Sequence, residues 1–551
     1  LIRKDRIEER LDAIEQLNRE AINREELREY LNPIYDLERL MTRISLKTAN
    51  PRDLISFKTS LSYLPYIRQL LAGYPSGLLH QIYEDLDGLE DIHQLLEDSI
   101  IEDPPLQIKE GGIIKDGYLE HIDELKHAKT DGKQWLAELE TKEREASGIK
   151  NLKIKYNKVF GYYFDVTNSY KELVPEHFIR KQTLANSERY TTEELDKLAD
   201  TILGSEDKLC ALEYETFCDI REKISGEIKR VQRTAHAVAM LDVMASLAYV
   251  TEQNHYIRPV MNEEGRLKIQ GGRHPVVEKM IPNDLFIRND TELDINENRI
   301  AIITGPNMAG KSTYMRQTAL IVLLAQMGCY VPADQADIGI VDRIFTRVGA
   351  SDDLASGQST FMVEMSEVAN ILRNATVNSL LILDEIGRGT STYDGLSIAW
   401  SVVEYISNFH RLGAKTLFAT HYHELTELEG QLPGVHNYCI AVKEQGDDIV
   451  FLRKIVKGGA DKSYGIQVAK LAGVPDSVID RAKEIVEELI ANDITAGTRK
   501  LVVDNSSRKK KEKLDEVDLA QMSLFDTVKD DDIIDELRNA DVGNMTPLEA
   551  L

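Results

Sequence analysis

The sequence predicts a multidomain protein of mixed class, in which a helical region with long helices is joined to an α/β domain built on a parallel sheet. Residues 1–127 and 191–257 repeat apolar side chains three or four positions apart, the spacing of a helix face. From residue 258 onward, short and wholly apolar runs alternate with amphipathic stretches, which is typical of a parallel sheet covered by helices on both faces. A length of 551 residues allows three to five domains at roughly 100–200 residues each.

The first helices are predicted at 11–17 and 38–45, with breaks at Asn50-Pro51 and Tyr74-Pro75, and a charged helix at 117–146. Residues 192–251 contain no proline and carry heptad-like apolar positions, so they predict one long helix. At about 1.5 Å per residue it would extend about 75–90 Å. We expect it to act as a strut that cannot bury itself in a compact core.

Between these helical parts, residues 128–190 contain a small β insert. Apolar and basic residues alternate over 152–156, and β character continues over 161–166, with a hairpin loop at Asn157-Lys158. In the α/β domain (258–455), the apolar runs 300–304, 380–383 and 416–419 predict buried strands. Residues 456–490 suggest a helix-turn-helix with Gly473 at the break and Pro475 opening the second helix. Residues 491–551 are polar and predict a flexible tail.

Composition excludes several classes of protein. The formal charge of −26 argues against a chain coated in nucleic acid, although it leaves room for a local basic surface. The four cysteines form no C-x-x-C pair, so neither a zinc site nor a disulfide framework is expected, and a reducing cytoplasm fits. No apolar run reaches the roughly 18 residues of a membrane span, and no membrane association is expected.

A phosphate-binding loop is predicted between the strand at 300–304 and the helix that follows it. The match to G-x-x-x-x-G-K-[ST] is formed by Gly305, Pro306, Asn307, Met308, Ala309, Gly310, Lys311, Ser312 and Thr313. The glycines let backbone N–H groups surround phosphate oxygens. We expect Lys311 to reach the β- and γ-phosphates of ATP and the Ser312 hydroxyl to bind Mg²⁺.

Two adjacent carboxylates end the strand at 380–383. We expect Asp384 to hold Mg²⁺ through water and Glu385 to act as the general base on the attacking water. His421, which ends the strand at 416–419, could contact the γ-phosphate, although a lone histidine at a strand end is more often structural. The small residues 356–360, which include Ser359, fit either a γ-phosphate site at a helix N-terminus or an ordinary helix cap.

The β insert carries a basic cluster in an otherwise acidic chain. Its members are Lys153, Lys155, Lys158, Arg180 and Lys181. Clustered lysine and arginine can neutralise DNA phosphates without reading bases. The alternative is a solvated charged face.

The motifs at 305–317, 352–365 and 384–395 occur in an order that resembles the ABC ATPases, and they are most similar to the MutS family of DNA mismatch-recognition ATPases. The resemblance implies ATP or ADP with Mg²⁺, a homodimer, double-stranded DNA and a MutL-type partner. It implies that Ser359 completes the partner subunit's site, that Phe286 stacks on adenine, and that His421 senses the γ-phosphate. It also makes 1–127 and 191–257 the core and lever, 128–190 the DNA-gripping clamp, 258–455 the ATPase domain and 456–490 the dimerisation helix-turn-helix.

The chain departs from the family at its amino-terminal end. It starts at Leu1 rather than Met, and no room precedes the lever for the mismatch-binding and connector domains. We therefore expect part of a longer protein, with specific mismatch reading lost and nucleoid-associated DNA binding through the clamp. The clamp argues against the recombination-suppressing paralogue. In the tail, Gln521, Leu524 and Phe525 resemble the peptide that docks on the replication sliding clamp.

Two other classes share the ATP chemistry. A transporter's nucleotide-binding subunit would be a compact domain of about 250 residues, without a lever or a basic β insert. A condensin-like DNA organiser would place hundreds of heptad residues between the two halves of its ATPase. Here Lys311 and Asp384 are only 73 positions apart (384 − 311), which disfavours that class.

Overall fold

The computed structural model describes residues 1–491 except 158, 160, 282–285, 307–308, 349–359, 446–447 and 460–463. The chain divides into two units, residues 1–464 and 465–551. The described residues do not include seven for which the sequence predicts a role, namely Lys158, Asn307, Met308, Ser359, Gln521, Leu524 and Phe525.

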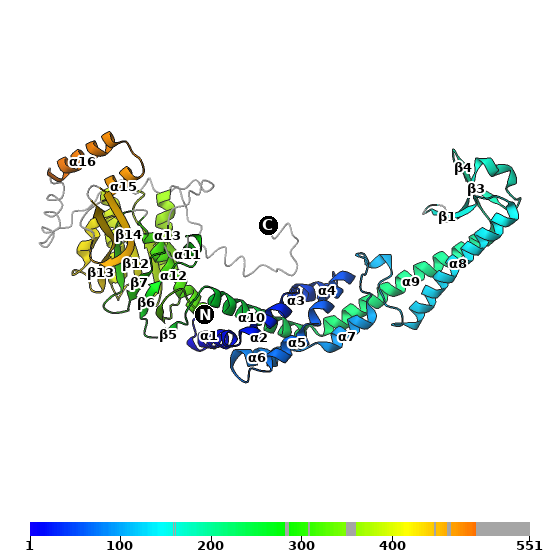
Figure 1. Cartoon of the computed structure of the whole chain (residues 1–551), viewed down its shortest axis with the longest axis horizontal. Helices are drawn as coiled ribbons and strands as arrows, with labels where there is room; N and C mark the ends of the chain where they lie inside the picture. The colour runs from blue at the N-terminus through cyan, green and yellow to red at the C-terminus, as the bar shows by residue number, and fades with distance from the viewer. Residues whose placement is uncertain are drawn as a thin grey trace, which may run out of the picture. The chain divides into compact units, whose positions relative to one another are not determined.

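The amino-terminal part of the first unit is helical (Figure 1). Its helices are α1 (Lys4–Arg19), α2 (Ala21–Leu31), α3 (Leu37–Ser45), α4 (Pro51–Leu61), α5 (Leu64–Leu71), α6 (Gly77–Asp85), α7 (Glu90–Ser99), α8 (Glu120–Ser147), α9 (Glu193–Gly226) and α10 (Ile228–Gln253), with a 3-10 turn at Ile108–Glu110. The predicted helices at 11–17, 38–45 and 117–146 are confirmed. The break at Asn50-Pro51 is a capping box, in which the Asn50 side chain accepts from Asp53 N–H and the Asp53 carboxylate accepts from Asn50 N–H.

The predicted single helix over 192–251 is wrong in two respects. It is two helices, because Glu227 leaves helical geometry (φ −96°, ψ 15°) directly after Gly226, a residue that weakens helices. At about 1.5 Å per residue, α9 and α10 extend about 51 Å and about 39 Å. In addition, α10 buries Val231, Ala235 and Leu241 in the helical core, so it does not stand clear of a core as a strut would.

The helix α10 is also relevant to the expectation that the protein is not associated with a membrane. Ile228–Gln253 is long and apolar enough to cross a membrane by length and composition alone. Half of its most apolar window is buried against other helices of the protein, as expected of a core helix. It packs against α1, α2, α3 and α6.

Helices α8 and α9 lie side by side (Figure 1). The sequence between them forms a four-stranded antiparallel sheet. Its order is β1-β2-β4-β3, formed by Lys153–Asn157, Gly161–Thr167, Ser187–Thr191 and Ile179–Thr183. Asn157 pairs with Gly161, which confirms the predicted hairpin. One face packs Phe164, Val166 and Tyr190 with Leu136 and Leu195 of the two helices, so this region has its own core.

The predicted parallel sheet is confirmed. Its order is β10 (Ile344–Arg347), β11 (Leu380–Asp384), β12 (Lys415–Thr420), β8 (Ile300–Thr304), β13 (Val435–Gln445) and β14 (Asp448–Lys457), and only the β13–β14 pair is antiparallel. Successive residues of β8 alternate between two cores. Helix α12 (Lys311–Met327) packs on one face, and α13 (Thr360–Asn374) and α14 (Thr392–Ser407) pack on the other, as predicted for strands buried on both sides.

A second four-stranded sheet flanks this domain, in the order β5 (Val260–Asn262), β9 (Gln335–Gly339), β6 (Leu267–Gly272) and β7 (Asn289–Leu293). Short helical segments occur at Val277–Met280 (α11) and His423–Leu428. The second unit contains α15 (Gly465–Leu471) and α16 (Asp476–Ala491). Gly473 lies between them with φ +86°, a left-handed conformation that suits glycine, and Pro475 precedes α16 by one residue.

Helix α1 is shared between the helical core and the core of the α/β domain. Ile7 and Leu11 are buried with α12, whereas Ile14 and Leu17 are buried with α10. Polar contacts reinforce the packing of α1 against the α/β domain. Arg10 donates to the Met327 carbonyl at the end of α12 (2.9 Å). Arg258 forms ion pairs of 2.7 Å with three carboxylates of α1, those of Glu8, Asp12 and Glu15. A single helix therefore joins the helical region to the helix that follows the phosphate-binding loop.

We predict that Leu11→Ala destabilises the protein by about 2–5 kcal/mol, because it removes a fully buried side chain and leaves a cavity. Ile22→Ala is the matched control, since Ile22 is 83% exposed on the next helix and its truncation should change stability by about 0.5 kcal/mol or less. Thermal unfolding followed by circular dichroism compares the two. Equal melting temperatures would contradict the bridging role of α1.

Candidate functional site

The site lies where the phosphate-binding loop meets the carboxyl edge of the parallel sheet. A cavity of about 710 Å³ opens there. Among the described residues it is lined by Pro306, Gly310, Lys311, Ser312, Thr313, Arg316, Arg347, Thr360, Glu364, Asp384, Glu385, Arg388 and Gly389. The loop follows β8 and ends at Gly310 (φ +106°), which starts α12. Gly305 and Gly310 both have positive φ, which explains why glycine stands at these positions of the motif.

The ammonium group of Lys311 is buried and hydrogen-bonded to backbone carbonyls. It donates to the Gly305 carbonyl (2.5 Å) and the Thr420 carbonyl (3.4 Å), and lies 4.0 Å from a carboxylate oxygen of Glu385. Burial lowers the pKa of Lys311, while the carboxylates of Glu385 and Asp384 oppose that shift. An anion in the cavity would favour the charged ammonium, so the position suits phosphate binding.

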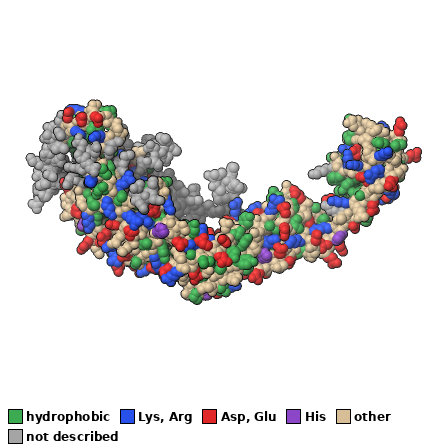
Figure 2. Space-filling view, viewed as in Figure 1, with side chains coloured by type: hydrophobic (Ala, Val, Ile, Leu, Met, Phe, Trp, Pro, Cys, Tyr) green, Lys and Arg blue, Asp and Glu red, His purple; other side chains and the backbone are tan. Residues whose placement is uncertain are grey.

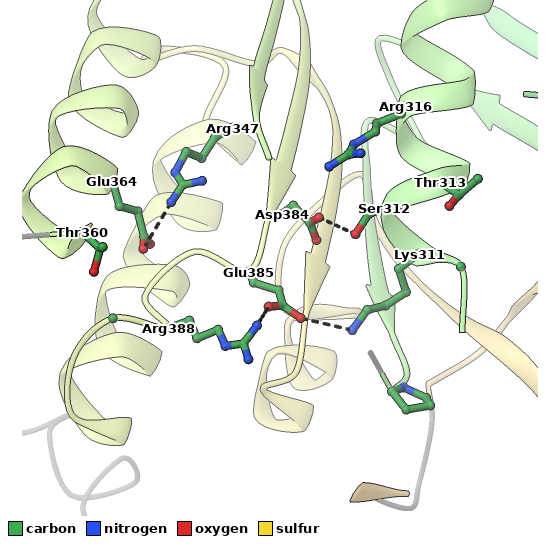
Figure 3. A pocket seen from close by; sticks show the side chains of 13 residues that line it. Lys311, Ser312, Thr313, Arg316, Arg347, Thr360, Glu364, Asp384, Glu385 and Arg388 are labelled. Carbon is green, nitrogen blue, oxygen red and sulfur yellow. Dashed lines mark hydrogen bonds and ion pairs between the residues drawn. The ribbon is translucent and has the colours of Figure 1, made fainter. Parts of the chain in front are cut away.

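Ser312 and Asp384, the two residues predicted to hold Mg²⁺, are in direct contact. The Ser312 hydroxyl donates to Asp384 Oδ2 at 2.5 Å, as Figure 3 shows. The other oxygen, Oδ1, is buried and has no hydrogen-bond partner among the described residues, and burial raises the pKa of this carboxyl. A buried, unpartnered carboxylate oxygen beside a hydroxyl suits a hard cation such as Mg²⁺.

The described part of the chain contains no cluster of three or more His, Cys, Asp or Glu side chains arranged to hold a metal. Mg²⁺ is commonly bound through one or two carboxylates together with substrate phosphates, and Asp384 with Ser312 offers oxygen ligands of this kind. The residues present therefore fit a cation that arrives with a nucleotide.

Glu385 follows β11 in a strained backbone conformation. Its φ of +54° is unusual for a residue with a side chain, and such outliers concentrate at functional sites. Its N–H donates to the Ala419 carbonyl (2.9 Å) of the neighbouring strand, and its carboxylate pairs with Arg388 (2.5 Å). Figure 3 shows Glu385 between Arg388 and Lys311, directed into the cavity. Glu385 thus follows the strand predicted at 380–383 and lines the cavity.

The turn that carries Glu385 is packed tightly onto its surroundings. We call residues 385–391 the β11–α14 turn. Gly387 (φ +88°) approaches Gly395 so closely that an added Cβ would lie 2.4 Å from the Gly395 carbonyl oxygen. The Gly387 N–H donates to Glu364 (2.6 Å), and its carbonyl accepts from the Tyr422 hydroxyl (3.0 Å). Both polar groups of one peptide position are therefore fixed by side chains from other elements.

His421 and Phe286 are placed less centrally. His421 follows β12 and is exposed. Neither His421 nor Phe286 is among the described residues that line the cavity. The protein around His421 lowers its pKa, mainly by desolvation, with Glu385 raising it and Lys311 lowering it, which favours the neutral imidazole at pH 7. Phe286 is half-buried in an irregular segment before β7.

Sequence reasoning missed several cavity residues, namely Arg316, Arg347, Glu364, Arg388 and Gly389. Arg388 and Gly389 stand within the 384–395 motif, and Glu364 stands within the 352–365 motif, so the motifs themselves were the available signal. Arg347 ends β10 with no local signal. It is buried and pairs with Glu364 (3.5 Å) and Glu367 (2.9 Å).

The predicted DNA-binding cations lie on the β1–β4 sheet, and most are engaged with acids. Lys155 pairs with Asp165 (2.5 Å), Arg180 with Glu188 (3.8 Å) and Lys181 with Asp196 (2.9 Å). Lys153 is exposed and has no ion pair among the described residues. Acidic and basic side chains are intermixed on the visible face of this region in Figure 2. The structure thus brings the cations onto one sheet, without making it purely basic.

A parallel sheet, a glycine-rich loop opening a helix, and a carboxylate ending another strand of the same sheet are the defining features of a P-loop fold. Comparison with known proteins refines this class. The family model described as MutS domain III matches residues 1–248, and that described as MutS domain V matches residues 301–490.

Three relatives carry the description DNA mismatch repair protein MutS. That of Lachnoclostridium phytofermentans is 69% identical over 502 residues, covering 91% of this chain and 54% of the relative. Those of Ruminiclostridium cellulolyticum and Caldanaerobacter subterraneus subsp. tengcongensis are 58% and 57% identical over 100% of this chain and 62% of each relative. The chain belongs to the MutS family. It spans 54–62% of the length of these relatives.

Proposed function

We propose that this chain is the ATP-hydrolysing part of a DNA mismatch-repair protein, and that it works as a homodimer on double-stranded DNA. The observation that carries the proposal is the Ser312–Asp384 pair at the base of the phosphate-binding loop, with Lys311 and Glu385 beside it. Together they supply a cation site, a phosphate ligand and a base at one edge of the sheet. Membership of the MutS family adds the biological setting.

In the proposed reaction, the loop backbone and Lys311 bind the phosphates of ATP. Ser312 and Asp384 would hold Mg²⁺, which neutralises charge on the phosphate oxygens. Glu385 accepts a proton from the attacking water, and Arg388, 2.5 Å from its carboxylate, orients it. His421, adjacent to Thr420 at the end of β12, contacts the γ-phosphate, and Phe286 stacks on the adenine.

The dimer is proposed because Ser359 belongs to the motif that, in the ABC class, reaches the partner's nucleotide. ATP that contacts two chains favours the closed dimer over the open one, which is a population shift driven by differential affinity. Residues 456–490 would supply further dimer contacts through α15 and α16. The core and lever (1–127 and 191–257) would carry closure from the ATPase domain (258–455) to the clamp (128–190).

The proposed partners follow from the same family. They are DNA gripped through its backbone, a MutL-type repair protein, and the replication sliding clamp through Gln521, Leu524 and Phe525 in the tail (491–551). A cytoplasmic, nucleoid-associated location is proposed with them.

We predict that Glu385→Ala binds ATP with near-normal affinity and lowers kcat by about 100-fold, the order expected for loss of a general base. The control is Glu292→Ala, which removes an exposed carboxylate on β7 outside the cavity lining. Single-turnover hydrolysis of labelled ATP and equilibrium binding of a fluorescent ATP analogue give the two quantities. Normal turnover would remove Glu385 as the base.

We predict that ATPase activity per subunit rises with protein concentration and saturates, because a shared site needs two chains. Ser359→Ala should retain nucleotide binding by single subunits and should lose this rise. The measurement is steady-state ATPase rate against concentration, with sedimentation velocity on the same samples. Flat activity through a range in which monomers become dimers would contradict the shared site.

We predict that Lys153→Ala weakens duplex DNA binding and lowers the salt-dependence slope of the binding constant by about 1, because one phosphate contact is lost. Lys223→Ala, an exposed lysine on α9, is the charge-matched control and should leave the slope unchanged. Fluorescence anisotropy over a range of salt concentrations measures both. Identical slopes for the two variants would exclude Lys153 as a phosphate contact.

A further inference from the structure

Glu364 is a buried acid that the proposed reaction does not use. It lies in the first turns of α13, lines the cavity, and is 5% exposed. Burying a carboxylate is costly unless it is paired and hydrogen-bonded. Its partners are therefore informative about what it does.

The two carboxylate oxygens of Glu364 have different partners. Oε1 accepts the backbone N–H of Gly387 at 2.6 Å, and Oε2 lies 3.5 Å from the guanidinium of Arg347, itself 5% exposed. In Figure 3 Glu364 and Arg347 lie next to each other, on the side of the cavity opposite Lys311 and Ser312. One oxygen thus fixes a backbone position of the β11–α14 turn, while the other is balanced by a cation.

The fixed position is two residues from the proposed base. Glu385 and Gly387 both have positive φ (+54° and +88°), and Ile386 between them is fully buried. Because this short segment is anchored at both ends, its geometry sets where the Glu385 carboxylate lies. The Tyr422 hydroxyl holds the Gly387 carbonyl at 3.0 Å from the opposite side. A displacement of about 1 Å in a reacting group can cost about 100-fold in rate.

We infer that Glu364 is a positioning residue for ATP hydrolysis, acting through its hydrogen bond to the Gly387 N–H to hold Glu385 in the strained conformation that faces the cavity. This role rests on the proposed function. It places the control of the hydrolytic step on α13, the helix that contains the end of the 352–365 motif. Glu364 does not touch the phosphate-binding loop in any described contact, so it should affect turnover rather than nucleotide affinity.

Four variants separate the hydrogen bond from the charge. Glu364→Ala removes both contacts, while Glu364→Gln keeps an acceptor for the Gly387 N–H and discards the charge. Glu367→Ala is the matched control, because Glu367 lies three residues further along α13 and pairs with Arg347 (2.9 Å) without contacting the turn. Tyr422→Phe removes only the second hydrogen bond to Gly387, and its phenyl ring preserves the packing.

The measurement is kcat and KM for ATP, with Kd for a fluorescent ATP analogue and the melting temperature, at protein concentrations that saturate activity. Glu364→Ala is expected to lower kcat by about 10-fold or more, with Kd within about 2-fold. Glu364→Gln and Glu367→Ala should stay within about 3-fold of the unmodified chain, and Tyr422→Phe should lower kcat at unchanged Kd.

The inference is overturned if Glu364→Ala turns over ATP normally, or if Glu364→Gln is as slow as Glu364→Ala, since the hydrogen bond would then be irrelevant. If Glu364→Ala does not fold, Tyr422→Phe decides the matter, and normal kcat in that variant also overturns it. Absence of ATPase activity in the unmodified chain is a separate result, because it removes the proposed function itself.

Discussion

Parallel pairing of β11, β12 and β8 is the constraint on which the site depends. Because the strands run in one direction, their carboxyl ends meet at a single edge of the sheet. The register pairs Asp384 with Ala419 and Thr420 with Thr304, so the carboxylates, the His421 segment and the phosphate-binding loop emerge side by side. A helix begins at the same edge with Lys311, adding the positive end of its dipole. No single segment contains this site.

The edge is also where the domain tolerates buried charge. Lys311, Asp384, Arg347 and Glu364 are all buried, although charged groups are costly to bury. Arg347 and Glu364 balance one another, while Asp384 keeps an unpartnered oxygen and Lys311 turns to loop carbonyls. The Arg347–Glu364 pair supports the β11–α14 turn, because Glu364 accepts a hydrogen bond from the Gly387 N–H. Asp384 and Lys311 line the cavity, where burial strengthens electrostatic interactions.

The helical region is not an independent attachment to this domain. Because α1 contributes Ile7 and Leu11 to one core and Ile14 and Leu17 to the other, a displacement of α12 changes the packing of the helical core. The three ion pairs from Arg258 hold the same helix from the α/β side. Packing therefore connects α12, the helix that begins at Lys311, through α1 to α10.

The sequence by itself determined the mixed fold class, the parallel sheet, the hairpin at Asn157, and the presence of Lys311, Ser312, Asp384 and Glu385 at one edge of that sheet. Local apolar periodicity and a contiguous loop motif are enough for these, since each depends on neighbouring residues. Only the tertiary structure decided that residues 192–251 are two helices with the second in a core, and that Arg347, Glu364 and Tyr422 hold the turn beside Glu385. The physical reason is that these features are contacts between distant segments, made when helices and strands pack, and no spacing along the chain encodes them.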